Sequence, residues 1–132
     1  MSDNTAAVNS TYVNASFKYS VEICSYLKGR NLDTAINLLR GVETKKVAIP
    51  MKRYKKKVAH QKGIGPGRFP MNTSRAIISL LESVGKNAEN KGLNREKLVI
   101  STMEANRSIS ARRSARFARG KLTNFTIVVK EE

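Results

Sequence analysis

The sequence predicts an α+β fold, with three helices and an antiparallel pair of strands. Three segments carry apolar residues at helical spacing, and each is followed by a glycine where a helix can end. Two later segments, residues 98–105 and 122–130, alternate apolar and polar residues as strands do. Nothing helical lies between those two segments, so antiparallel pairing is expected. The length of 132 residues fits a single domain.

The helices are predicted from caps and apolar stripes. Ser16 stands at the N-cap of the first, and Gly29 ends it. Asn31 caps the second, which Gly41 is expected to end, and Gly92 closes the third. The stripes are formed by Phe17, Val21, Cys24 and Leu27, by Leu32, Ala35, Ile36 and Leu39, and by Ala76, Ile77, Leu80, Leu81, Val84 and Ala88. Such stripes are typical of a core, and the alternative is that they form grooves for a partner.

The strands are predicted from period-two alternation. In the first, Leu98 and Ile100 are expected on one face, and the other apolar residues on the opposite face, namely Val99, Met103 and Ala105. In the second, one face carries Phe125, Ile127 and Val129. A further short strand is expected near Tyr12 and Val13, after a mobile tail at residues 1–8. Gly85, inside the third helix, is expected to weaken it by about 1 kcal/mol relative to alanine, if exposed.

The charge distribution indicates a polyanion as the partner. The formal net charge is +15, and no acidic residue occurs between Glu43 and Glu82. Because a folded surface normally mixes both signs to limit self-repulsion, a run this one-sided favours neutralisation by nucleic acid. The alternative is an ordinary solvated charge run. The basic residues of this region are Lys45, Lys46, Lys52, Arg53, Lys55, Lys56, Lys57, Lys62, Arg68 and Arg75, with His60 among them.

Residues 44–71 form a long basic loop without sustained periodicity, rich in proline and glycine. Its glycines would let the backbone approach phosphates closely while lysine and arginine neutralise them. Tyr54 and Phe69 would stack on unpaired bases, or alternatively anchor the loop to the core. The glycines at 63, 65 and 67 match neither a dinucleotide-binding fingerprint nor a P-loop.

The connector 106–121 between the two C-terminal strands is the second candidate RNA-binding segment. It contains no acid, and arginine suits bidentate phosphate contacts and stacking on bases. The alternative is a disordered basic loop. Its cations are Arg107, Arg112, Arg113, Arg116, Arg119 and Lys121, and Phe117 is a further candidate for base stacking.

Several functions are excluded by what the sequence lacks. His60 and Cys24 are each the single residue of their kind, too few for a zinc site, and Cys24 lies on an apolar stripe. No clustered acid–base set is present, so we expect neither an enzyme nor a cofactor. A membrane-surface protein would need a basic amphipathic helix, whereas the basic residues here fall outside the predicted helices. This class of protein is therefore the least favoured. The N-terminus lacks a secretory signal, so a cytosolic protein is expected.

These residues together resemble a known family. The chain is similar, from about Ser16 to Lys130, to the universal large-ribosomal-subunit protein family numbered twenty-two, formerly seventeen in eukaryotes. The most specific stretches are residues 47–54 (VAIPMKRY) and 67–70 (GRFP). Residues 87–93 (NAENKGL) with 98–100 (LVI) give further support, and residues 112–120 (RRSARFARG) fit as well. The long basic loop resembles the archaeal and eukaryotic branch.

The resemblance implies three helices packed on a small antiparallel sheet, with a projecting β-hairpin. It implies a structural constituent of the large subunit that binds rRNA near the polypeptide exit tunnel, with residues 107–121 as a hairpin arm contributing to the tunnel wall. The implied partners are large-subunit rRNA, neighbouring ribosomal proteins and the nascent polypeptide, without membrane association or homo-oligomerisation. The hairpin looks shortened after Gly120, and the eukaryotic C-terminal tail is absent after Glu132.

The resemblance also implies a location. The implied location is the ribosome in the cytoplasm. If the source is eukaryotic, the protein would pass through the nucleus and nucleolus during assembly, and residues 52–57 would serve as the nuclear import signal. The residues alone leave one alternative open. A free-standing RNA- or DNA-binding regulator would use the same charges on a target that dissociates.

Overall fold

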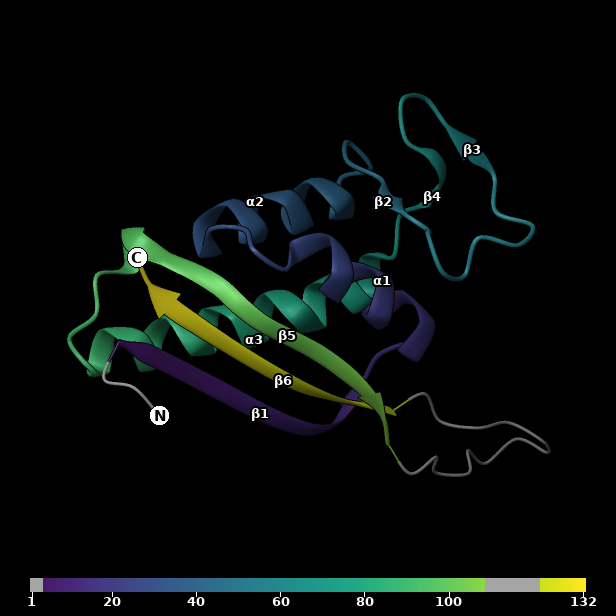
Figure 1. The fold of residues 1–132 in the computed structure, drawn as a ribbon. Helices are drawn as coiled ribbons and strands as arrows, with labels where there is room; N and C mark the ends of the chain where they lie inside the picture. The colour runs from purple at the N-terminus through teal and green to yellow at the C-terminus, as the bar shows by residue number, and fades with distance from the viewer. Residues whose placement is uncertain (1–3, 109–121) are drawn as a thin grey trace.

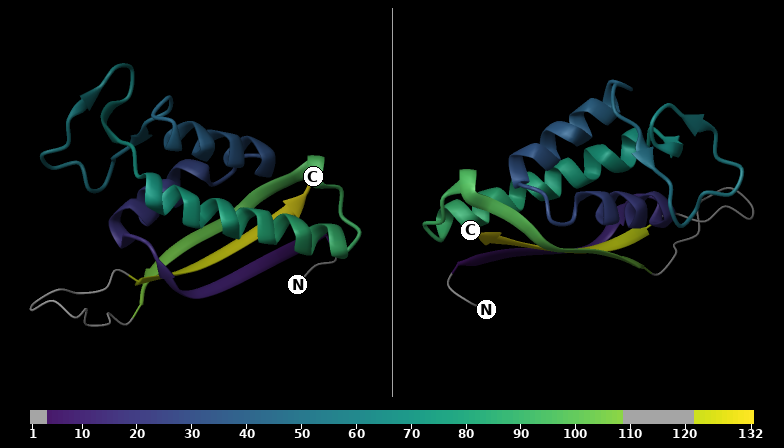
Figure 2. Two further views of the ribbon diagram at one scale, coloured as in Figure 1. Left: turned by 180° about the vertical axis from the view of Figure 1, so that it is seen from behind. Right: turned by 45° about the horizontal axis from the view of Figure 1, so that its top comes forward.

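The computed structural model describes residues 4–108 and 122–132. A three-stranded antiparallel sheet carries three helices on one face, and a second, smaller sheet lies within the basic loop (Figures 1 and 2). In chain order the elements are β1 (Thr5–Asn14), α1 (Phe17–Leu27), α2 (Leu32–Glu43), β2 (Ile49–Pro50), β3 (His60–Gln61), β4 (Gly65–Arg68), α3 (Met71–Asn90), the 3₁₀ turn η1 (Arg95–Lys97), β5 (Leu98–Arg107) and β6 (Leu122–Glu131). The predicted α+β class is confirmed.

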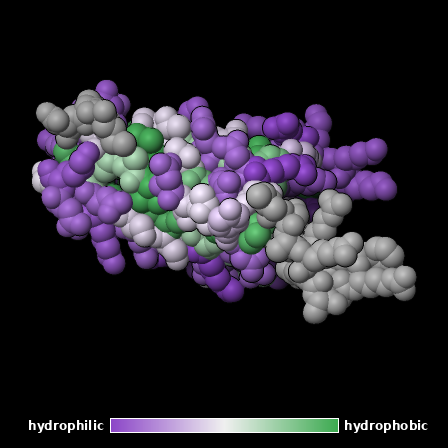
Figure 3. All heavy atoms as spheres, turned by 90° about the horizontal axis from the view of Figure 1, so that it is seen from below, coloured by the Kyte–Doolittle hydropathy of each residue, from purple (hydrophilic) through white to green (hydrophobic). Residues whose placement is uncertain are grey.

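The main sheet has the strand order β1-β6-β5, with both pairings antiparallel. The predicted pairing of the two C-terminal strands is therefore confirmed. Phe125, Ile127 and Val129 of the central strand β6 all face the helices and are buried, as the alternation predicted. No helix of the described residues covers the opposite face of the sheet (Figure 2, right). Viewed from below, pale and apolar residues occupy the middle of the molecule, and hydrophilic side chains gather at its two ends (Figure 3).

Strand β1 extends further than the sequence predicted. The expected short strand at Tyr12 and Val13 is part of a ten-residue strand that pairs with β6 from Thr5 onwards. The expectation of a mobile tail at residues 1–8 is therefore wrong for residues 5–8, and Ala6 is only 1% exposed. Small polar residues resembled a tail because their role as a sheet edge depends on β6, which is more than a hundred residues away in the chain.

The predicted helices are all present. Asn31 caps α2, since its Oδ1 accepts a hydrogen bond of 3.0 Å from the N–H of Asp33. Gly92 closes α3 in the left-handed region, with φ of 83°, and the N–H of Leu93 donates to the carbonyl of Ala88. Gly29 has the same role after α1, with φ of 86°.

Two glycines have roles other than those predicted. Gly41 does not end α2, which runs to Glu43 and closes on Lys45, whose φ is 60°. A Cβ at Gly41 would lie 2.8 Å from Cγ2 of Val47, so this glycine permits a close approach of the following chain. Gly85 is buried against the side chains of Leu32 and Arg95, so the propensity cost expected for an exposed glycine does not decide its effect.

The faces of β5 were predicted only in part. Leu98 and Ile100 are buried as expected. Met103 shares their face and is 4% exposed, so its predicted position on the opposite face is wrong. Ala105 also packs against the core from this inner face. The register shifts between Ile100 and Thr102. Because a β-bulge adds one residue, every later side chain changes face relative to simple alternation.

Candidate nucleic-acid interface

The predicted cations of the acid-free region between Glu43 and Glu82 are all exposed in the structure. This holds for Lys45, Lys46, Lys52, Arg53, Lys55, Lys56, Lys57, Lys62, Arg68 and Arg75, for His60, and for Arg107 at the end of β5. The loop contains the small antiparallel sheet β2-β4-β3, so it has more regular structure than its sequence predicted. It projects beyond the helices at one end of the molecule (Figure 1).

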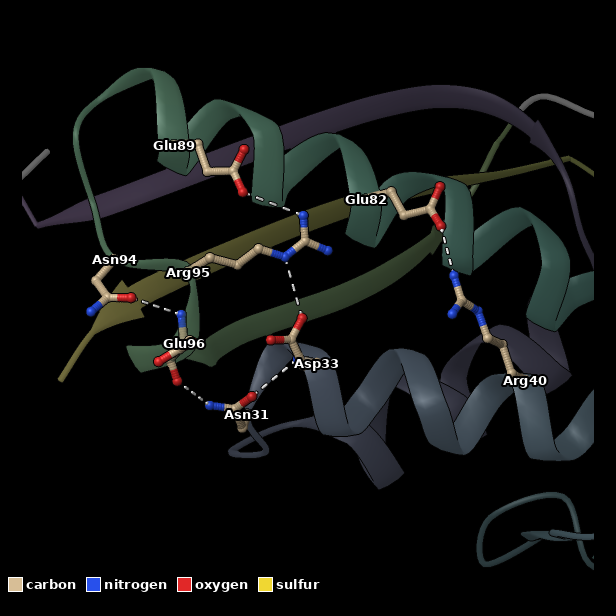
Figure 4. Close-up of polar contacts among 8 residues, drawn as sticks. All are labelled: Asn31, Asp33, Arg40, Glu82, Glu89, Asn94, Arg95 and Glu96. Carbon is tan, nitrogen blue, oxygen red and sulfur yellow. Dashed lines mark hydrogen bonds and ion pairs between the residues drawn. The ribbon is translucent and has the colours of Figure 1, made fainter.

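Three acidic residues of α2 and α3 pair with arginines away from this loop. Arg95 of η1 contacts Asp33 at 3.3 Å and Glu89 at 3.5 Å, and Arg40 contacts Glu82 at 3.2 Å (Figure 4). These contacts join α2, α3 and η1. Each pair is at least partly exposed, so each contributes modestly to stability.

The basic loop differs from the helices, because ion pairs do not balance its positive charge. Among the described residues, no acid forms an ion pair with a cation between Lys45 and Arg68. Arg75, at the start of α3, differs because it lies 3.8 Å from Glu43. The described loop cations therefore have no acidic ion-pair partner, and their binding to phosphates stays a prediction.

A buried acid fixes the loop to the helical layer. Glu22 of α1 is 3% exposed. Its Oε2 accepts a hydrogen bond of 2.6 Å from the N–H of Lys52, and its Oε1 accepts bonds of 2.8 Å from Arg53 and 3.3 Å from Tyr54. Three backbone donors converge on one carboxylate, which satisfies its buried charge. The side chains of Lys52 and Arg53 are exposed next to this anchored backbone.

Sequence reasoning missed Glu22 because it treated the acidic residues as a group excluded from the basic region. One signal was present. Glu22 lies among apolar residues on a predicted core helix, between Val21 and Ile23, where an acid needs buried donors.

A cationic cleft lies between the basic loop and the start of α1. Its volume is about 300 Å³, and it is lined by Ser16, Lys18, Tyr19, Tyr54, Lys56, Val58 and Arg68. The guanidinium of Arg68 donates a hydrogen bond of 2.8 Å to the hydroxyl of Tyr19. The Tyr54 ring lies 5.6 Å from Nζ of Lys18 and 5.3 Å from the guanidinium carbon of Arg53. The cleft therefore combines an aromatic ring with cations on several sides, which suits a nucleotide.

The two predicted stacking residues of the loop differ in environment. Phe69 is half-buried and packs against the hydrophobic core, which favours the anchoring alternative. Tyr54 is half-buried at the cleft wall, where its ring remains a candidate for stacking on a base. Phe69 also borders a second cavity of about 530 Å³, formed with Tyr19 and the first turn of α3.

Comparison of the sequence with known proteins identifies a family. The model of the family described as ribosomal protein L22p/L17e matches residues 8–127, which is most of the chain and includes the basic loop. The chain belongs to the ribosomal protein L22p/L17e family. It was identified as a member from its sequence stretches, and that resemblance is confirmed.

Relatives with the printed name large ribosomal subunit protein uL22 support the same assignment. That of Thermoplasma volcanium is 35% identical over 98% of this chain and 92% of its own length. That of Thermoplasma acidophilum is 39% identical over 88% of this chain and 82% of its own length. That of Picrophilus torridus is 49% identical, over 61% of this chain and 54% of its own length. Proteins of this family are components of the large ribosomal subunit.

Part of the predicted interface lies outside the described residues. This applies to Arg112, Arg113, Arg116, Phe117, Arg119 and Lys121 of the connector. Arg107, at its base, lies in β5 with its guanidinium carbon 4.7 Å from the centre of the Phe17 ring.

Tyr12 lies near the same end of the sheet and is 61% exposed, with φ of 57° at a break in the β1 register. A side chain held exposed in this strained conformation is a further candidate contact that periodicity did not single out.

Metal ligands, membrane-spanning helices and the cysteine can also be assessed in the described part of the chain. Residues 4–108 and 122–132 contain no group of three or more metal-ligating side chains placed to share an ion, and no helix among them has the length and hydrophobicity to cross a membrane. Burial, and to a lesser extent the charge of Glu104, raises the pKa of the Cys24 thiol from 9.0 to about 12. Cys24 packs in the core, as its position on the apolar stripe predicted.

Proposed function

We propose that this protein is a structural constituent of the large ribosomal subunit that binds rRNA near the polypeptide exit tunnel through its basic loop. Membership of the ribosomal protein L22p/L17e family supports the proposed location in the large ribosomal subunit. The observation that supports the interface most strongly is the set of exposed loop cations without acidic partners, held to α1 by the Glu22 carboxylate.

The proposed mechanism is neutralisation and positioning. Lysine and arginine displace counterions from packed rRNA, which lets RNA helices of like charge approach one another. The loop backbone is fixed at Lys52–Tyr54, so its cations reach the RNA from a defined surface with a smaller loss of conformational entropy. Recognition then depends on RNA shape, with Tyr54 at the cleft contributing a stacking surface.

The connector is the second part of the proposal. Residues 107–121 form a hairpin arm between β5 and β6 that contributes to the tunnel wall and lies near the nascent polypeptide. The support is that these two strands pair directly and their ends at Arg107 and Thr123 are opposite one another. The ends of β5 and β6 that border the connector lie towards the end of the molecule from which the basic loop projects (Figure 1).

Sedimentation of the tagged protein from cell extract through a sucrose gradient tests the main proposal. At about 0.5 M salt, loosely bound cationic proteins dissociate because electrostatic contacts are screened. Quantitative co-migration with the large subunit is expected. Release to the top of the gradient would instead favour a regulator that binds nucleic acid reversibly.

A photo-crosslinker in place of Phe117 tests the proposed hairpin arm, because it should react with a stalled nascent chain in purified ribosomes.

A further inference from the structure

Strand β5 has an edge that is only half paired. At its first half, the N–H of Ile100 donates to the carbonyl of Arg30 at 2.9 Å, and the N–H of Gly29 donates to the carbonyl of Ile100 at 2.8 Å. Ile100 lies opposite Val129, while Met103 and Ala105 lie opposite Ile127 and Phe125 of the same strand. The backbone groups of Met103 and Ala105 therefore have the same phase as those of Ile100 and point away from β6.

In the second half of β5, no described segment pairs with these outward groups. Beyond the sheet itself, the backbone hydrogen bonds on this edge involve Ile100 and not Met103 or Ala105. Folded proteins usually cover, charge or shorten such an edge, because it is a template for another strand.

A groove runs along this open edge. Its volume is about 500 Å³, and its walls are α1 on one side and β5 on the other. Phe17 and Val21 of α1 and Met103 of β5 contribute apolar surface, and Ser25 and Lys28 continue the α1 wall. Phe17 and Val21 are only half-buried, although they belong to the apolar stripe predicted for the core.

The charge around the groove is positive. Lys28, Arg53 and Arg107 are exposed at its borders, and Glu104 is the one acid among its described lining residues. Among the described residues, none of these three cations is in an ion pair. An occupant with acidic side chains at its ends would complement them.

We propose that this groove binds an extended, acidic segment of a neighbouring large-subunit protein, which adds to the sheet beside β5 as a fourth strand. The inference rests on the proposed function, since the neighbour is met in the assembled subunit. Alternating outward backbone donors and acceptors beside an apolar helix face are the requirements of strand addition. RNA fits this groove less well, because it would leave the apolar wall without apolar contacts and the backbone N–H groups of the β5 edge without strand-type hydrogen-bond partners.

Amide hydrogen exchange in purified large subunits tests the pairing without any substitution. The N–H groups of Met103 and Ala105 should exchange at least about tenfold more slowly in the subunit than in the free protein, because strand pairing protects them. Equal exchange in the two states would overturn the proposal. If the unmodified protein does not sediment with the subunit, the proposed function fails and the inference fails with it.

A photo-crosslinker identifies the occupant. Benzoylphenylalanine in place of Ser25, on the α1 wall, should crosslink in the purified subunit to one polypeptide segment. Crosslinking to rRNA, or to nothing, would overturn the proposal even though the protein is assembled.

A matched pair of variants links the crosslink to the edge itself. Ala105→Pro removes an N–H that points outwards and leaves the bonds to β6 intact, whereas Ala105→Val keeps that N–H. The yield of the crosslink should fall several-fold in subunits carrying Ala105→Pro and stay unchanged with Ala105→Val. Equal yields in the two would show that side-chain contact alone holds the neighbour, and would overturn strand addition.

Discussion

The carboxylate of Glu22 accepts a hydrogen bond of 2.8 Å from the backbone N–H of Arg53. This contact joins a buried helix position to an exposed arginine thirty-one residues later in the chain. It makes the basic loop part of the folded domain at the point where its cations are densest.

Glu22→Gln should loosen this junction. The amide presents donors where one carboxylate oxygen accepted, so at least one buried N–H loses its partner. We expect the free energy of unfolding to fall by about 1–3 kcal/mol. Chemical denaturation measures the loss, and faster amide exchange at Lys52–Tyr54 should accompany it.

Glu82→Gln is the matched control. The Glu82 side chain is 43% exposed and pairs with Arg40. Its replacement should cost less than about 1 kcal/mol. Equal losses in the two variants would contradict the anchoring role of Glu22.

Replacing Lys55, Lys56 and Lys57 together by glutamine should weaken rRNA binding and reduce its dependence on salt. Each lost phosphate contact lowers the slope of log K against log salt by about 0.7–0.9. Binding of a large-subunit rRNA fragment at several salt concentrations measures this slope. A triple variant at Lys86, Lys97 and Lys130 removes the same charge from outside the loop. If both variants lower the slope equally, total charge and not the loop governs binding.

Gly85→Ala should destabilise the protein although alanine favours helices. The new Cβ would lie 3.2 Å from Cδ2 of Leu32, which is fully buried, and 3.4 Å from the guanidinium of Arg95. A gain of about 1 kcal/mol in helix propensity is opposed by about 1–3 kcal/mol of overpacking. Thermal unfolding should show a net loss of about 1 kcal/mol, and a raised Tm would contradict this packing.

Cys24 should react slowly with thiol reagents in the folded protein. With its pKa raised from 9.0 to about 12, the thiolate fraction at pH 8 is about a thousandfold lower than in the unfolded chain. Labelling in buffer and in denaturant measures the difference. Labelling at the same rate in both would show that the helix α1 opens readily.

The same pKa predicts a loss of stability in alkali. The unfolded thiol ionises first, so the unfolded state is favoured increasingly as the pH rises from 9.0 towards about 12. Cys24→Ala removes this contribution, and its stability should fall less steeply with pH than that of the unmodified protein.

Local sequence determined the helices, the central strand and the charge of the interface. The cap at Asn31, the closing glycine Gly92 and the alternation through Phe125 depend on neighbours within a few residues, so the chain encodes them directly. The absence of acids from the basic loop likewise needs no structure to be seen.

Tertiary structure decided what depends on distant partners. Strand β1 exists because β6 pairs with it, Met103 faces inwards because of a bulge, and Gly41 is required by the approach of Val47. Glu22 became the anchor of the loop only when folding brought three backbone donors to its carboxylate. A sequence pattern reports the conformation that neighbouring residues prefer, whereas these features arise from contacts that form only once the chain has closed on itself.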